Sequence, residues 1–99
     1  MYILQVDFPF DGPFAEEMAQ ALRPLAEDIA GEEQLRWKIW TEDADGRQAG
    51  GIYLFDDRAA AQAYLDKHSQ RLQAAGIRNI RSRIFAVNQA LSLIDRAPI

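Results

Sequence analysis

The chain has 99 residues, of which 48% are hydrophobic and 26% are charged, and its formal net charge at pH 7 is −4. These values predict one globular domain spanning residues 1–99, and the negative charge argues against nucleic acid or an anionic membrane as a partner. The absence of cysteine excludes disulfides and thiolate chemistry, and the single histidine, His68, excludes a multi-histidine zinc site, so we expect no bound metal.

The N-terminal third of the chain predicts a strand followed by a helix. Apolar and polar residues alternate over residues 2–8, which is typical of a strand. The same segment lacks the basic start and the long apolar run of a signal peptide, so we expect a cytoplasmic protein. Apolar residues then recur every three or four positions, which predicts a helix that starts at Pro13, kinks at Pro24 and stops at Gly31.

Residues 35–55 predict two strands joined by a tight turn, and they include both tryptophans. Alternation in the first strand gives one apolar and one mixed face, with Trp37 and Trp40 on opposite faces, and Asp45-Gly46 is a strong hairpin signal. Residues 52–55 are apolar in succession, which is typical of a central strand covered on both sides. Gly50-Gly51 leads into this strand, so it predicts a bulge or a close backbone approach and not a phosphate loop.

The C-terminal half predicts a second helix, a fourth strand and a short last helix. Asp56 or Asp57 caps the second helix, and Gly76 ends it. We expect the fourth strand over residues 80–88, with Asn88 as the cap of the last helix. The apolar stripe predicted for the second helix consists of Ala61, Leu65, His68, Leu72 and Ala75, with Tyr64 at its border.

The predicted element order is β-α-β-β-α-β, which right-handed crossovers fold into an α+β, ferredoxin-like domain with an antiparallel four-stranded sheet. Strands one and three take the centre, and both helices cover one face. The residues predicted for the opposite face are Ile3, Trp40, Tyr53, Phe55, Phe85 and Val87. So much apolar surface needs a cover, and a second copy of the same sheet is the simplest one, so we expect a homodimer.

An RNA-recognition module shares this element order and stacks bases on aromatic residues of its central strands. The acidic charge of the chain argues against that function. The Lys/Arg-Gly-aromatic opening of the third-strand motif is also absent, with Gln48-Ala49-Gly50 in its place.

His68 is the only side chain expected to titrate near neutral pH. No second histidine and no serine-histidine-acid order accompanies it. On the residues alone, a partly buried helix histidine bonded to a neighbour is therefore favoured over a catalytic one.

Six sequence blocks carry a resemblance to a known family, in order and with matching spacing over nearly the whole chain. The blocks are DGPF, LRPLAEDI, RWKIWTE, AGGIYLF, AYLDKH and FAVNQALSLI. In these blocks the chain resembles the YdhR-type monooxygenases of the dimeric α+β barrel superfamily, and RWKIWTE followed by AGGIYLF is the most specific part. Asp11 stands where the family is expected to have asparagine, a small departure within a turn.

The resemblance implies a homodimer whose sheets face each other as a barrel, with a pocket in each subunit between sheet and helices. It also implies that a small aromatic or quinol-like substrate is oxidised by O₂ without metal, flavin or other cofactor. The catalytic residues that it implies are His68, as base or anion partner, and Tyr53 and Trp37, as walls of an aromatic slot. The further substrate contacts that we expect are Phe10, Trp40 and Asn88. Alternation places Tyr53 on the barrel face, so its role rests on the resemblance alone.

Two alternatives to this function remain open. A haem-degrading monooxygenase of the same superfamily would use His68 as an axial ligand. Those enzymes pair the histidine with an asparagine on the first strand, where this chain has Gln5 and Asp7, which argues against the alternative. A non-catalytic dimeric small-molecule binder would instead bind its ligands tightly without turnover.

Overall fold

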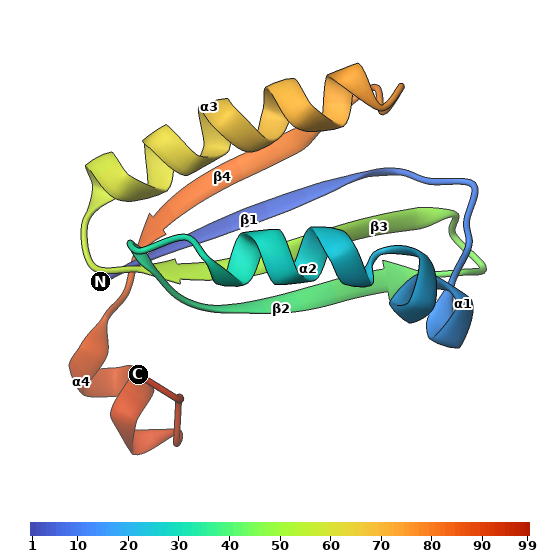
Figure 1. Ribbon diagram of the computed structural model, residues 1–99. Coiled ribbons are helices and arrows are strands. Elements are labelled where there is room, and N and C mark those ends of the chain that lie inside the picture. Colours follow the sequence, from blue (N-terminus) through green and yellow to red (C-terminus); the bar gives the residue numbers. More distant parts are fainter.

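The computed structural model describes residues 1–99 as a four-stranded antiparallel sheet with three of the four helices on one face (Figure 1). The strands are β1 (Tyr2–Pro9), β2 (Leu35–Asp43), β3 (Gln48–Phe55) and β4 (Arg81–Ala86). The helices are α1 (Ala15–Ala21), α2 (Arg23–Ala30), α3 (Arg58–Ala74) and α4 (Gln89–Ile94). The strand order β2-β3-β1-β4 confirms the ferredoxin-like topology and the central position of the first and third strands.

The helix predicted between Pro13 and Gly31 is in fact two helices. α1 begins at Ala15, two residues after the expected start, and its C-cap is Leu22. Pro24 then occupies the first turn of α2, where a backbone N–H has no partner inside the helix, so its absence is tolerated. The proline therefore starts a new helix instead of kinking a continuous one, and Gly31 ends that helix as predicted.

Both ends of α3 are closed as the sequence predicts. The Asp57 carboxylate accepts a hydrogen bond from the N–H of Ala60 at 2.7 Å, which caps the N-terminus. At the other end Gly76 has a φ of 91°, a left-handed conformation that favours glycine. The N–H of Ile77 donates to the carbonyl of Leu72 at 3.0 Å, which completes a Schellman motif.

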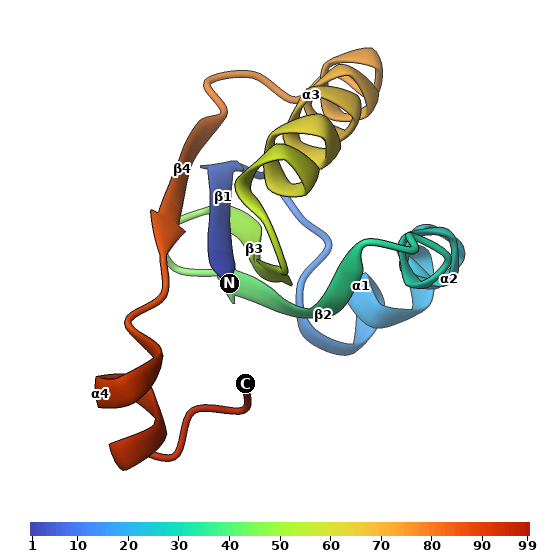
Figure 2. The same ribbon diagram turned by 90° about the vertical axis from the view of Figure 1, so that its left-hand side faces the viewer.

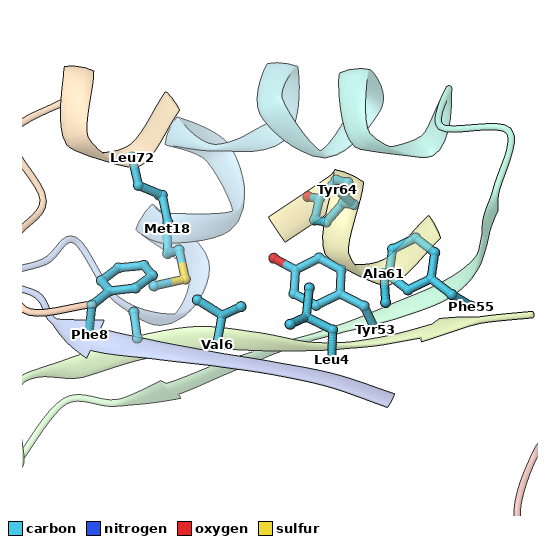
Figure 3. Packing of buried hydrophobic residues seen from close by; sticks show 10 residues of the cluster. Leu4, Val6, Phe8, Met18, Tyr53, Phe55, Ala61, Tyr64 and Leu72 are labelled. Atoms are coloured by element: carbon cyan, nitrogen blue, oxygen red, sulfur yellow. The ribbon is translucent and has the colours of Figure 1, made fainter. Parts of the chain in front are cut away.

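The core lies between the sheet and helices α1 to α3 (Figure 3). Its members on the sheet side are Leu4, Val6, Phe8, Ala49, Tyr53 and Phe55, and on the helices Met18, Ala61, Tyr64 and Leu72. Tyr64 joins the two layers, since its ring centroid lies 5.0 Å from that of Tyr53 and 5.6 Å from that of Phe55. Tyr64 is therefore a full member of the buried stripe of α3, whereas Ala75, which was expected there, is exposed.

The central strand β3 turns its aromatic side chains toward the helices, not toward the open face that was predicted. Residues paired across neighbouring antiparallel strands lie on the same face, and Tyr53 pairs with Leu4 of the core. Tyr53 and Phe55 are therefore buried under the helices (Figure 3). The prediction was wrong because residues 52–55 are apolar at every position, so their pattern does not say which alternate set faces the helices.

The two tryptophans of β2 lie on opposite faces as predicted, but with the faces exchanged. Trp40 pairs with Gly51 and faces the helices, whereas Trp37 pairs with Leu54 and faces outward. A register irregularity between Leu35 and Trp37 interrupts the alternation, so these two residues no longer share a face. A pattern of strict alternation cannot reveal such an irregularity.

Gly50 lies where β3 passes close to β1. A Cβ atom at Gly50 would overlap the carbonyl oxygen of Val6 and would stand 2.9 Å from the Cα of Asp7. The pairing of β1 with β3 is regular at this point, with Asp7 opposite Gly50. The close backbone approach predicted for Gly50-Gly51 is therefore confirmed.

The outer face of the sheet, which points away from α1 to α3, is apolar, but its residues differ from those predicted. They are Ile3, Trp37, Ile39, Ile52, Leu54 and Phe85. Ile39 is 50% exposed and Phe85 is 44% exposed, so part of this contiguous apolar face is open to solvent. The prediction that the second face of the sheet is apolar is thus confirmed, although most of the residues that form it differ from those predicted.

Helix α4 projects from the rest of the chain on the side away from α3 (Figures 1 and 2). Asn88 caps it, because its side-chain oxygen accepts a hydrogen bond from the N–H of Leu91 at 3.1 Å. The indole N–H of Trp37 donates to the carbonyl of Pro98 at 2.9 Å, which ties the C-terminal residues to β2. None of the four helices has the length and apolar character needed to cross a membrane.

Candidate active site

A pocket of about 190 Å³ lies in the apolar layer between the sheet and the helices. Its hydrophobic lining consists of Phe8, Phe10, Met18, Leu22, Leu25, Trp40, Ala49, Tyr53, Leu72, Ala75 and Ile77. The remaining lining residues are Lys38, Thr41, Gly50 and His68. Pockets for drug-sized ligands measure about 300–1,000 Å³, so this one suits a molecule of one or two rings.

A wider, more open groove of about 330 Å³ runs beside α1, α2 and β2 and shares Met18, Leu22 and Trp40 with the pocket. Its charged residues already have partners. Glu42 accepts a hydrogen bond from the N–H of Ala15 at 2.7 Å, and Arg23 pairs with Glu27 at 3.1 Å. The groove therefore offers no free reactive group, and the smaller pocket is the candidate site.

Four of the six residues predicted for the site line the pocket: Phe10, Trp40, Tyr53 and His68. Trp37 does not, because the irregularity in β2 turns it to the outer face. Asn88 does not either, because it caps α4 beyond the end of β4. The structure thus brings together residues from β2, β3, α3 and the loop after β1.

His68 is 3% exposed, and its Nδ1 lies 3.1 Å from Nη2 of Arg71, which also pairs with Asp28 of α2 at 2.7 Å. A guanidinium can only donate, so Nδ1 accepts and the ring proton resides on Nε2. Burial, followed by the positive charges of Lys38 and Arg71, lowers the pKa of His68 to about 4. His68 is therefore a neutral hydrogen-bond donor at pH 7, which corrects the expectation that it titrates near neutrality.

Lys38 is the residue of the site that sequence reasoning missed. Its Nζ lies 3.3 Å from the ring centroid of Trp40 and 4.8 Å from that of Tyr53. Burial, and then the charge of Arg71, lowers the pKa of Lys38 to about 7. A signal did exist, because Lys38 stands two positions before Trp40 in a strand and so shares its face.

Tyr53 forms a wall of the pocket. Its ring centroid lies 5.0 Å from that of Tyr64 and 6.0 Å from that of His68. Burial raises the pKa of the Tyr53 phenol far above its ordinary value, so it stays protonated at neutral pH. Tyr53 can therefore act as a hydrogen-bond donor but not as a base.

A haem does not fit this site. The pocket of about 190 Å³ is too small for a tetrapyrrole. Neither nitrogen of His68 has a free lone pair, since Nδ1 accepts from Arg71 and Nε2 carries the proton. Gln5 of β1 faces outward, opposite Ile52, so this strand side chain does not reach the pocket either.

These observations define a class: a ferredoxin-like α+β domain with a small aromatic pocket between sheet and helices. The model of the family described as "Putative mono-oxygenase ydhR" matches residues 3–98. The chain belongs to this family, which confirms the resemblance drawn from the sequence blocks. Membership supports a general monooxygenase role.

Similar solved structures agree with the fold. A structure described as "antibiotic biosynthesis monooxygenase" has a TM-score of 0.63 at 19% identity, covering 88% of this chain and 98% of its own. A "putative antibiotic biosynthesis monooxygenase" from Deinococcus radiodurans has a TM-score of 0.59 at 16% identity, covering 89% and 93%. A protein from Mycobacterium tuberculosis has a TM-score of 0.59 at 17% identity, covering 88% and 95%. No sequence among the curated proteins matches the chain.

Proposed function

We propose that the protein is a cofactor-independent monooxygenase that oxidises a small aromatic or quinol-like substrate with O₂. The observation that carries this proposal is the pocket of about 190 Å³, which is lined by aromatic and aliphatic side chains around Lys38, Tyr53 and His68. Family membership supports oxygenation in general, and the shape and lining of the pocket support the substrate class.

The chemistry requires little from the protein beyond a dry, shaped site. A substrate that has lost its hydroxyl proton is electron-rich enough to pass one electron to O₂, and the two radicals then combine through a new C–O bond to give a peroxide. The peroxide takes up a proton and loses water, which breaks its O–O bond and the C–H bond at the same carbon, and one oxygen atom stays in the product as a carbonyl. The aromatic walls hold the ring and keep bulk water away from the radicals. The Nε2–H of His68 and the hydroxyl of Tyr53 are donors for the negative charge of the substrate.

Oxygen consumption by the purified protein tests this function directly. We expect uptake of O₂ with a panel of hydroquinones and anthrone-like substrates, and incorporation of one atom of isotopically labelled O₂ into the product by mass spectrometry. Trp40→Ala should slow the reaction at least tenfold, because it removes a wall of the pocket. Lys67→Met is the matched control, since Lys67 pairs with Glu32 on the surface. Tight binding without O₂ uptake would favour the non-catalytic binder instead.

We also propose that the active form is a homodimer in which the outer faces of two sheets pack together. The exposed Ile39 and Phe85 on this face support the proposal, as does the apolar surface of α4 at Leu91, Leu93 and Ile94. Burying these side chains against a second copy removes a large apolar area from water. The pocket lies on the other side of the sheet, so each subunit keeps its own site.

The mass in solution tests the dimer. Light scattering should give twice the mass of one chain, and Ile39→Lys should shift the protein toward a monomer by placing a charge in the interface. Ala19→Lys, on the exposed side of α1, should leave the mass unchanged. A monomer mass for the wild-type protein would refute the dimer.

A further inference from the structure

We propose that Lys38 is the proton acceptor of the pocket, and that the preferred ligand is a weakly acidic hydroxyaromatic molecule bound as its anion. This inference rests on the proposed function, because it names the base and the substrate class of the same site. Three kinds of observation carry it. They are the position of the amine, the charges around it and the state of its neighbours.

The Lys38 amine lies against the aromatic surface of the pocket. Its Nζ is 3.3 Å from the ring centroid of Trp40 and 4.8 Å from that of Tyr53, and both rings line the pocket. A flat ligand packed on these rings brings its own substituents next to the amine. Gly51 makes this position possible, because a Cβ there would stand 2.8 Å from Cε of Lys38.

The surroundings of Lys38 contain no counterion for it. α3 contributes His68, which is neutral, and Arg71, and β3 contributes the protonated Tyr53. Lys38 forms no ion pair, and the carboxylates of Asp28 and Glu32 pair with Arg71 and Lys67 instead. A protonated Lys38 therefore leaves an unbalanced positive charge, and an anionic ligand would balance it.

The proton transfer takes place in one step. The O–H bond of the ligand breaks, an N–H bond forms on the neutral Lys38 amine, and the products are a phenolate or enolate and an ammonium ion. Nothing is oxidised or reduced in this step. His68 is not the acceptor, because its Nδ1 already accepts a hydrogen bond from Arg71 and its Nε2 carries a proton.

Burial prepares the amine for this role. A lysine with the ordinary value of 10.5 would be neutral in roughly one molecule in 3,000 at pH 7. With a pKa of about 7, about half of the Lys38 side chains are neutral at that pH. Once the ligand is ionised, an ion pair at about 4 Å in a partly buried site favours the anion by roughly a thousandfold.

Binding of 2-naphthol tests the proposal, because its anion absorbs at longer wavelength than the neutral form. At a pH at which free naphthol is protonated, we expect the bound molecule to show the anion spectrum. Lys38→Met should abolish that spectrum and weaken naphthol binding at least tenfold by calorimetry. Binding of 2-methoxynaphthalene, which has no proton to lose, should change by no more than about twofold in Lys38→Met. Lys67→Met is again the matched control.

The outcomes separate this inference from the proposed function. Bound naphthol with a neutral spectrum, or an anion spectrum that persists in Lys38→Met, would overturn the role of Lys38 even if the wild-type protein consumes O₂. An anion spectrum that depends on Lys38, in a protein that consumes no O₂, would support the role and refute the monooxygenase. NMR of protein labelled at the lysine Cε gives a ligand-free readout: the Lys38 signal should titrate near pH 7, and titration only above pH 9 would contradict the proposal.

Discussion

Replacing Lys38 should stabilise the fold, and the gain should depend on pH. The pKa of Lys38 is lowered from 10.5 to about 7 in the folded chain, mainly by burial. Below pH 7 both the folded and the unfolded chain hold the proton, and the folded state bears the full penalty of a buried charge. Between pH 7 and 10.5 the unfolded chain binds more protons, so the free energy of unfolding of the wild type rises with pH.

The size of the effect follows from the same two values. From pH 7 to pH 9 the linkage relation gives the wild type about 2 kcal/mol of added stability that Lys38→Met lacks. The flexible stem lets the ammonium reach toward water, so we expect roughly half of this, about 1 kcal/mol. In a domain of this length that corresponds to roughly 4–8 °C in the melting temperature.

The measurement is urea unfolding at both pH values, followed by far-ultraviolet circular dichroism. Protein concentration is held fixed, because a dimer makes the apparent stability depend on it. Lys38→Met should exceed the wild type in stability at pH 7, and the difference should shrink by about 1 kcal/mol at pH 9. Lys67→Met should show no such trend. If the difference in the free energy of unfolding between the wild type and Lys38→Met stays constant with pH, the Lys38 amine is hydrated and the reasoning fails.

Three further predictions concern the scaffold and its histidine. Gly50→Ala should lower the free energy of unfolding in urea by about 2–4 kcal/mol, because its Cβ overlaps the β1 backbone. Gly31→Ala, at a helix end with an ordinary φ, should change that free energy by no more than about 0.5 kcal/mol. Asp57→Ala should lower the free energy of unfolding by about 1 kcal/mol, since it removes the cap of α3; a neutral result would show that water replaces that cap. Nitrogen NMR should find His68 as the Nε2–H tautomer, with no titration of its ring between pH 5.5 and 8. Arg71→Met removes a nearby positive charge, so it should raise the pKa of His68, while burial still holds that pKa below 6.5.

The helix ends and the strand order could be predicted because they depend on local chemistry. Asp57 caps α3 and Asn88 caps α4 through their own side chains, and Gly76 closes α3 through a conformation that favours glycine. The strand order follows from right-handed crossovers between elements whose type was clear from periodicity. None of these features requires knowledge of a distant part of the chain.

The faces of β2 and β3 could not be predicted because they depend on how distant strands pair. Tyr53 faces the helices only because it lies opposite Leu4, and Trp37 faces outward only because the register shifts after Leu35. Lys38 was missed for a related reason. A single lysine on the mixed face of a strand gives no sign of a sheltered position, and the space that shelters Lys38 is created by Gly51 on the neighbouring strand.

The position of the two tryptophans gives the chain two separate optical reporters. Trp37 lies on the outer face, hydrogen-bonded to Pro98, so its fluorescence should respond to assembly and to movement of the C-terminal residues. Trp40 lies in the pocket beneath the Lys38 ammonium, so its emission should respond to ligand entry and to the protonation of that amine. Trp37→Phe and Trp40→Phe would therefore let one native signal be followed at a time, with no attached dye.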